Sequence, residues 1–305
     1  MTKNDLLLHI TQKDWAQQEK RTKTSFWASD CLRPSLEIYW RFVNEEPTNP
    51  ILSERLLLMQ VGKLYEEAIV SELVEMGEIA VESNGQHRVE MEREFVKITG
   101  YMDAVHKQGY PIEIKTHYAT VVDNQLEAGK PPSDHYCHQL AVYMDFLDSD
   151  KGVMISANRA NGNIYFSEMN RVGPLLFEIN DYCFDLELEY KRFRALMENH
   201  IIPMKEPPLD YFYHPELTKE LLDMYPAEKI KKAIKGDRVL CDHRWRYQYS
   251  GFKDKVIEKE AALRGVSKDA LCTYIEDEVG FMMDYLGVEW KQTKAGARLY
   301  KKKGD

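Results

Sequence analysis

Two acidic residues and a lysine stand close together on segments with the pattern of β-strands. Apolar and polar residues alternate on both sides of a turn centred on Gln108, which predicts a β-hairpin over residues 100–116. Antiparallel pairing about that centre places Asp103 opposite Glu113, with Cβ atoms roughly 4.5–5.5 Å apart. Because like charges so placed repel each other, we expect a divalent cation between the two carboxylates, or a proton retained by one of them.

Lys115 extends this pair to a set of three. Glu113 and Lys115 are two residues apart and share one face of a strand, while Ile112 and Ile114 point the other way into a core. Asp103, Glu113 and the backbone carbonyl of Ile114 offer the oxygen ligands that Mg²⁺ prefers. Lys115 could then orient or help deprotonate an attacking water and stabilise the charge of the transition state, which is phosphodiester hydrolysis chemistry. The alternative is a set of ordinary ion pairs on a solvated sheet face.

Two predicted helices flank the hairpin and carry further polar residues. The helix expected over residues 52–76 contains Gly62 and Glu66, and a glycine there suggests close approach of another backbone or a ligand. The helix expected over 135–147 places Gln139 and Tyr143 four residues apart, on one face. A solvent-facing glutamate and a tyrosine at the edge of the core would explain these residues without a function.

Four short motifs occur in the order found in one enzyme superfamily. They are Gly62-x-x-x-Glu66, Gly100-x-x-Asp103, Glu113-Ile114-Lys115 and Gln139-x-x-x-Tyr143. In this order the chain resembles, over roughly residues 25–200, the RecB-like and lambda-exonuclease-like branches of the PD-(D/E)XK nuclease superfamily. The resemblance implies an α/β fold with a mixed central β-sheet flanked by helices, a restriction-endonuclease-like core.

The resemblance also implies roles for single residues. Glu66 would be a further metal ligand beside Asp103, Glu113 and the carbonyl of Ile114, and the site would hold one or two Mg²⁺ or Mn²⁺ ions. Gln139 and Tyr143 would steady the site or the scissile strand, which with Lys115 completes the expected catalytic set.

The cysteines depart from some members of that superfamily, which hold an iron–sulfur cluster on four thiolates. Cys31 and Cys241 stand about where the outer two ligands would be, but Arg244 occupies the place of a second downstream cysteine. We therefore expect no iron–sulfur cluster. The five cysteines are widely scattered without a Cys-x-x-Cys pair, so free thiols are the expected state.

The remaining pattern suggests two parts. The expected core has five further elements and one connection. A helix runs from Ser29 or Asp30 to about Val43, and a strand over 88–97 carries Glu94, which could face the site. A polar connection over 119–133, two strands over 152–156 and 163–169 and a helix over 178–200 follow. Prolines and loop residues over 202–208 mark a boundary, which gives a nuclease core over 1–205 and a mostly helical extension over 206–305. A terminal hairpin is expected around Gly296.

Composition bounds the location and partners. The 305 residues carry a net charge of −9, and neither an apolar run long enough to span a bilayer nor a signal-peptide pattern is found, so a cytoplasmic protein that does not contact membranes is expected. Seven basic residues against two acidic ones lie between Lys229 and Arg246. This basic cluster could contact DNA, or it could be a solvated face.

These observations favour a metal-dependent deoxyribonuclease, more specifically an exonuclease of recombination, repair or phage DNA processing, because no module for reading base sequence is found. Alternatives are an endonuclease of the same fold, a non-catalytic DNA-binding protein and an RNA-directed nuclease. Expected partners are single- or double-stranded DNA ends, with a homo-oligomer or a recombination or replication protein also open. Four tyrosines near the motifs could stack on bases: Tyr101, Tyr110, Tyr118 and Tyr136.

Overall fold

The computed structural model describes residues 25–33, 35–43, 53–79, 87–199, 219–223, 225–235, 251–263, 280–293 and 296–302. The chain divides into two compact units, one comprising residues 1–46 and 51–202 and the other 47–50 and 203–305. The sequence also predicts helices over 5–20 and 268–285. The first of these, the linker over 202–208, Cys241 and Arg244 lie outside the described residues, as do residues 268–279 of the second, whose residues 280–285 are helical. The assignment of residues 1–205 to a nuclease core stays a prediction.

A mixed six-stranded sheet forms the centre of the first unit. Its strands, in spatial order, are β4 (Ala104–Val105), β5 (Pro111–His117), β6 (Lys151–Asn158), β7 (Ile164–Arg171), β8 (Leu176–Ile179) and β9 (Tyr182–Asp185). Only β5 and β6 are parallel, and the chain crosses between them through α4 (Thr120–Glu127) and α5 (Asp134–Leu147). A crossover helix is the usual way to join parallel neighbours, and the fold class is α/β, as the sequence predicts.

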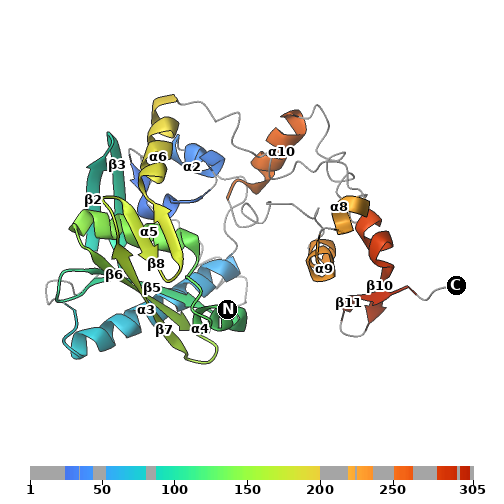
Figure 1. The fold of residues 1–305 in the computed structure, drawn as a ribbon, viewed down its shortest axis with the longest axis horizontal. Helices are drawn as coiled ribbons and strands as arrows, with labels where there is room; N and C mark the ends of the chain where they lie inside the picture. The colour runs from blue at the N-terminus through green and yellow to red at the C-terminus, as the bar shows by residue number, and fades with distance from the viewer. Residues whose placement is uncertain are drawn as a thin grey trace, which may run out of the picture. The chain divides into compact units, whose positions relative to one another are not determined.

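A second sheet and four more helices complete this unit (Figure 1). The three-stranded sheet has the order β1 (Phe26–Trp27), β3 (Val96–Met102) and β2 (His87–Arg93). The helices are η1 (Ala28–Asp30), α2 (Ser35–Phe42), α3 (Ser53–Glu75) and α6 (Glu187–Asn199). The expected helix over 29–43 begins only at Ser35, because a 3-10 turn over 28–30 precedes it.

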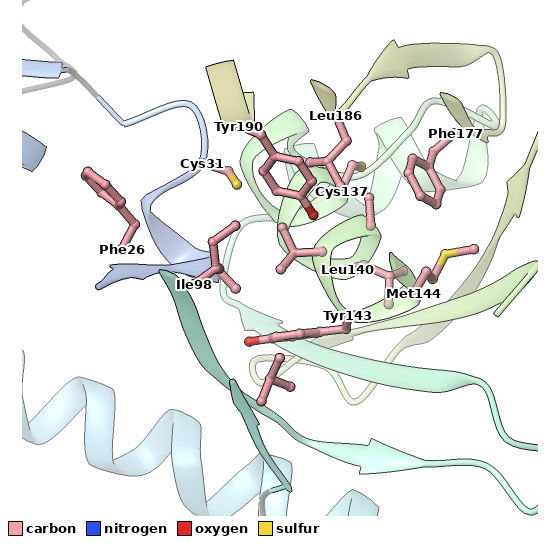
Figure 2. Packing of buried hydrophobic residues seen from close by; sticks show 14 of the residues in the cluster. Phe26, Cys31, Ile98, Cys137, Leu140, Tyr143, Met144, Phe177, Leu186 and Tyr190 are labelled. Carbon is pink, nitrogen blue, oxygen red and sulfur yellow. The ribbon is translucent and has the colours of Figure 1, made fainter. Parts of the chain in front are cut away.

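Helices cover both faces of the six-stranded sheet at β5. Ile112, Ile114 and Ile155 point to one face and pack with Ile69 and its neighbours on α3. Side chains on the other face pack against α5, where Leu140 and Met144 lie over β6 (Figure 2). Since side chains alternate along a strand, Glu113 and Lys115 lie on the α5 side of β5.

The predicted hairpin has the expected register but is shorter than expected. Ala104 pairs with Ile112 and Val105 with Pro111, so the next positions along the same register are Asp103 and Glu113. The chain before Asp103, however, is β3, which pairs with β1 and β2 in the other sheet. A single hairpin over residues 100–116 is therefore wrong, because the chain leaves one sheet for the other at Asp103.

The strand predicted over 88–97 is interrupted by a turn. Glu94 and Phe95 both have positive φ angles, 51° and 65°, and join β2 to β3. Glu94 lies partly exposed in that turn, with an ion pair of 3.4 Å to Arg194. The suggestion that Glu94 faces the site is wrong.

Two further expectations about the core need correction. The helix predicted over 178–200 begins at Glu187, since residues 176–185 alternate between buried and exposed positions and form the β8–β9 hairpin around Asn180, whose φ is 51°. The connection over 119–133 is not without structure, because it contains α4. Strands are found where residues 152–156 and 163–169 predict them, as β6 and β7.

The second unit contains helices and one hairpin. The helices with described bounds are α8 (Lys219–Asp223), α9 (Ala227–Lys235) and α10 (Lys253–Leu263), and the hairpin of β10 (Val288–Thr293) and β11 (Gly296–Lys301) confirms the one expected around Gly296. Its apolar cluster consists of Leu222, Ile230, Ile234, Met282 and Val288. Of the basic cluster, residues 236–246 lie outside the described part of the chain. No described helix has the length and apolarity to cross a membrane.

Candidate functional site

Glu113 is a fully buried acid in the middle of β5. Its side chain is 0% exposed, and its Oε2 accepts no hydrogen bond from any described residue. Lys115, two positions on, forms an ion pair with Oε1. One lysine is little compensation for the loss of hydration, and burial together with the nearby charge of Asp103 raises the pKa of Glu113 to about 8.

Asp103 lies at the point where the two sheets separate. It is 8% exposed, and its Oδ2 accepts the backbone N–H of Ile114 at 2.8 Å. The N–H and C=O of one strand residue point to the same edge, so the carbonyl oxygen of Ile114 also faces the edge of β5 where Asp103 lies. β4 pairs only with Pro111 and Ile112, and no other described strand pairs with this edge of β5 beyond Ile112.

Glu66 belongs to the same electrostatic cluster although it comes from α3. Burial and the charge of Asp103 raise the pKa of Glu66 to about 7, while Lys115 and Arg159 oppose the rise. Burial acts to lower the pKa of Lys115, but the charges of Glu113 and Asp103 outweigh it and raise the pKa above its usual value. Glu66, Asp103, Glu113 and Lys115 thus lie close enough for their charges to act on one another's pKa values, and Glu113 pairs directly with Lys115.

The donor set fits a hard divalent cation. Asp103, Glu113 and Glu66 supply carboxylate oxygens, the carbonyl of Ile114 faces the same edge, and Oε2 of Glu113 has no hydrogen-bond partner among the described residues. Among the described residues no group of three His, Cys, Asp or Glu side chains is already arranged as a metal site. Cation binding would therefore require these side chains to move from the positions described here.

Gln139 and Tyr143 are joined to each other beside this cluster. The Nε2 of Gln139 donates to the hydroxyl of Tyr143 at 3.0 Å, and that hydroxyl donates to the carbonyl of Tyr101 at 2.9 Å. Burial and the charge of Glu113 raise the pKa of Tyr143 well above its usual value. The pair connects α5 to β3 directly before Asp103, which suits a supporting part better than direct contact with a cation.

Gly100 explains how Tyr143 reaches this position. A Cβ at Gly100 would lie 2.9 Å from Cε1 of Tyr143 and 3.1 Å from its hydroxyl, closer than real Cβ atoms come to a ring carbon. The ring of Tyr143 therefore lies against the bare backbone of β3, in the core that Figure 2 shows. The glycine of Gly-x-x-Asp makes room for the tyrosine of Gln-x-x-x-Tyr.

Gly62 has a similar part on the other side of β5. A Cβ there would lie 3.2 Å from Oγ1 of Thr116 and 3.3 Å from Nη1 of Arg159. A close approach is found at this glycine, but it is made by the side chains of Thr116 and Arg159 and not by another backbone. Glu66, one helical turn later, lies on the same side of α3, and the contact at Gly62 fixes how near it comes to the cluster.

The four candidate stacking tyrosines lie in different places. Tyr136 lies beside the cluster, with Nζ of Lys115 5.3 Å from its ring centre, and Tyr118 follows β5 directly with its ring against Arg159. Tyr101, on β3, is partly exposed and packs against Trp27. Tyr110 precedes β5 and stacks on His106 at 4.1 Å, at the opposite end of the strand from Lys115.

Sequence reasoning missed Arg159. It follows β6, and because β5 and β6 are parallel, the residue after β6 lies beside the end of β5 that carries Lys115 and Thr116. Two neighbouring parallel strands were not evident from the sequence, which offered Lys115 alone as the basic residue of the site. The signal would have been the arginine directly after the second strand of a β-helix-β unit.

The described cysteines are free. Cys31 and Cys137 are buried, and burial raises the pKa of both thiols, that of Cys137 to about 12. Figure 2 shows both in the apolar core near Tyr190. The absence of an iron–sulfur cluster stays a prediction, since Cys241 lies outside the described residues.

Comparison with known proteins gives structural neighbours only. No known family model matches the chain, and no curated protein matches it by sequence. The crystal structure of SSO0001 is 18% identical with a TM-score of 0.43, over 69% of this chain and 90% of the other. An alkaline exonuclease from Laribacter hongkongensis is 15% identical with a TM-score of 0.42, over 59% and 89%, and its complex with dAMP gives 13% and 0.41, over 61% and 92%. These values assign neither activity nor substrate to this chain.

Proposed function

We propose that this protein is a nuclease that hydrolyses DNA phosphodiester bonds with Mg²⁺ or Mn²⁺. The observation that carries the proposal is Glu113, a wholly buried carboxylate that pairs with Lys115 through Oε1, has no described partner at Oε2, and lies next to Asp103 and Glu66. Burying an acid among other acids destabilises a protein unless a cation compensates the charge or the acid keeps its proton. Ordinary surface ion pairs, the alternative explanation, do not fit a side chain that is 0% exposed.

Each residue of the cluster has a part in this proposal. Asp103, Glu113 and the carbonyl of Ile114 would hold the cation, with Glu66 as a further ligand, and the bound cation would supply charge that activates water and neutralises the leaving oxygen. Lys115, held by Glu113, would orient the attacking water and stabilise the negative charge of the transition state. Gln139 and Tyr143 would fix the backbone of Tyr101, two residues before Asp103.

Exonuclease action is the finer part of the proposal. The cluster lies at an open strand edge, and no module for reading base sequence is evident, so phosphate contacts and stacking aromatic residues such as Tyr136 and Tyr118 would hold the strand. An endonuclease would use the same cluster. A role in recombination, repair or phage DNA processing, and a homo-oligomer or partner protein, belong to the proposal as expectations from the sequence.

The test is cleavage of end-labelled linear DNA, closed circular DNA and RNA with Mg²⁺ or Mn²⁺, with and without EDTA. We expect nucleotides released from linear DNA only, inhibition by EDTA, and loss of at least a thousandfold in kcat for Lys115→Ala. The matched control is Lys107→Ala. Lys107 is a half-exposed lysine of the same hairpin and pairs with Glu78, so its removal should leave kcat unchanged within about twofold.

The outcomes separate the alternatives. Cutting of closed circles would identify an endonuclease. Cutting of RNA alone would identify an RNA-directed nuclease. DNA binding without cleavage under all metal conditions would identify a non-catalytic DNA-binding protein. Equal activity of Lys115→Ala and wild type would overturn the site.

A further inference from the structure

Arg159 lies next to the acidic cluster without a carboxylate of its own. No described acidic side chain is within ion-pair distance of its guanidinium, whereas other arginines of this unit, such as Arg93, Arg171 and Arg194, each pair with an acid. Its charge nevertheless reaches the cluster and acts on Glu66. A partly exposed guanidinium in this place is available to a negatively charged ligand.

The guanidinium is held in one orientation by neutral groups. Its Cζ lies 3.9 Å from the ring centre of Tyr118, and its Nη1 donates to the carbonyl of Leu58 on α3 at 3.0 Å. Its backbone N–H donates to the carbonyl of His117 at 2.8 Å. A stacked arginine fixed in this way loses little conformational freedom when it binds a ligand.

The loop that carries Arg159 is fixed by a second acid. Asp123 on α4 is buried, and its Oδ2 accepts the side-chain amides of Asn158 at 2.7 Å, Asn161 at 2.9 Å and Asn163 at 3.4 Å. These asparagines end β6 and form the turn into β7, on both sides of Arg159. One carboxylate oxygen of α4 thus holds the β6–β7 turn by three hydrogen bonds, and these restrict the backbone that carries Arg159.

The place of Arg159 relative to the cluster defines what it could bind. Its Nη1 would meet a Cβ on Gly62 at 3.3 Å, and Glu66 is one helical turn from Gly62. Nε of Arg159 is buried without a partner. Tyr118, beside it, is 46% exposed and offers an aromatic surface to a ligand. A guanidinium can bind a phosphate, and an aromatic ring beside it can stack on the base of the same nucleotide. The next phosphate of such a strand would lie at the acidic cluster.

We propose that Arg159, supported by Tyr118, forms a subsite for a phosphate of the nucleic-acid strand next to the one that is cleaved. The inference rests on the nuclease function proposed above and adds a positioning residue to it. Arg159 would bind the strand and not take part in bond cleavage, because its contacts lie with Leu58 and Tyr118 and not with Lys115 or Glu113.

The experiment measures steady-state cleavage of linear DNA by full-length wild type, Arg159→Gln, Arg159→Lys and the matched control Arg194→Gln. Arg194 is an exposed arginine that pairs with Glu198 and Glu94, so the control removes the same charge from a place outside the site. We expect KM to rise about tenfold for Arg159→Gln with kcat within about threefold, and an intermediate KM for Arg159→Lys, which keeps the charge but not the planar fork.

A binding measurement separates the subsite from the fold. DNA affinity measured with Ca²⁺ in the Lys115→Ala background should depend on salt with a slope smaller by about one for Arg159→Gln. Tyr118→Leu, which removes the ring and leaves the guanidinium, should weaken binding less than Arg159→Gln. Unchanged KM and salt slope in a folded Arg159→Gln that still cleaves DNA would overturn the subsite alone. Wild type that neither binds nor cleaves DNA would overturn the proposed function and the subsite together.

Discussion

The Oδ2 atom of Asp103 accepts the backbone N–H of Ile114 at 2.8 Å, so one carboxylate takes the place of a strand partner at the edge of β5. Among the described strands this edge is open there, because β4 begins only at Ala104 and β3 belongs to the other sheet. Asp103 thus has a structural part, closing the edge, and a proposed part as a metal ligand. The two parts can be separated by the choice of substitution.

Asp103→Asn and Asp103→Ala should differ in stability but not in activity. The asparagine keeps an oxygen that can accept the N–H of Ile114, whereas alanine leaves this N–H unpaired, at a cost of about 1–3 kcal/mol in free energy of unfolding. Both remove the charge, so both should lose divalent-cation binding and cleavage. Urea unfolding and a cleavage assay check this, and an active Asp103→Asn would contradict the ligand role.

Gly62→Ala should lower activity without the stability gain that alanine usually gives. Replacing glycine at a compatible position stabilises by about 0.4–1 kcal/mol through the unfolded chain. At Gly62 the new Cβ would lie 3.2 Å from Oγ1 of Thr116 and 3.3 Å from Nη1 of Arg159, so these side chains must give way or α3 must shift and take Glu66 with it. The matched control is Gly280→Ala, where nothing lies within 4 Å of the new Cβ.

Thermal unfolding and kcat should therefore respond differently to the two alanines. We expect Gly280→Ala to be neutral or stabilising with unchanged kcat, and Gly62→Ala to lose about tenfold in kcat. Full activity in Gly62→Ala would show that the packing of α3 on β5 does not position Glu66.

The local sequence patterns predicted which residues of the site lie together, but they did not predict how the strands that carry them are connected. Alternation around Gln108 gave the register that brings Asp103 and Glu113 together, and the spacing of Gln139 and Tyr143 gave their contact. The transfer of the chain to a second sheet at Asp103 leaves no local signal, because β3 and β4 both alternate. Glu94 was misplaced for the same reason, since a turn with two positive φ angles formed at residues without glycine.

Long-range pairing was the other limit of the sequence. The β8–β9 hairpin was mistaken for the start of a helix, although Asn180 with its neighbouring aspartate is a reasonable turn. Arg159 was missed because its place depends on β5 and β6 being parallel neighbours, and this depends on α5 packing across both strands. Tertiary packing decides such pairings, and a short apolar stretch does not reveal its partner.

His135 should make stability depend on pH. Burial lowers the pKa of His135 to about 4, against the opposing effect of its Nδ1 hydrogen bond of 2.6 Å to the carbonyl of Cys31. Between about pH 6.5 and 4 the unfolded chain binds a proton at this residue that the folded protein does not, so stability falls as pH falls through that window. The loss should reach about 2–3 kcal/mol by the lower end.

The measurement is the free energy of unfolding of wild type and His135→Asn from pH 8 to pH 4.5. The asparagine amide can donate to Cys31 but does not titrate, and the acidic cluster is common to both proteins, so its contribution cancels in the difference. We expect the difference to be constant above pH 7 and to turn against wild type below pH 6.5. A difference that stays flat to pH 4.5 would contradict the burial of a neutral imidazole.

The central claim is that the carboxylates of Asp103, Glu113 and Glu66 lie around a place for a divalent cation. Anomalous diffraction at the manganese absorption edge, on crystals grown with Mn²⁺, tests it most directly. The account predicts a peak bounded by the side chains of Asp103 and Glu113 and the carbonyl of Ile114, which disappears in Glu113→Gln but persists in Glu168→Gln, an exposed acid on β7. Crystals in which Mn²⁺ binds elsewhere while these oxygens stay without a cation would contradict it.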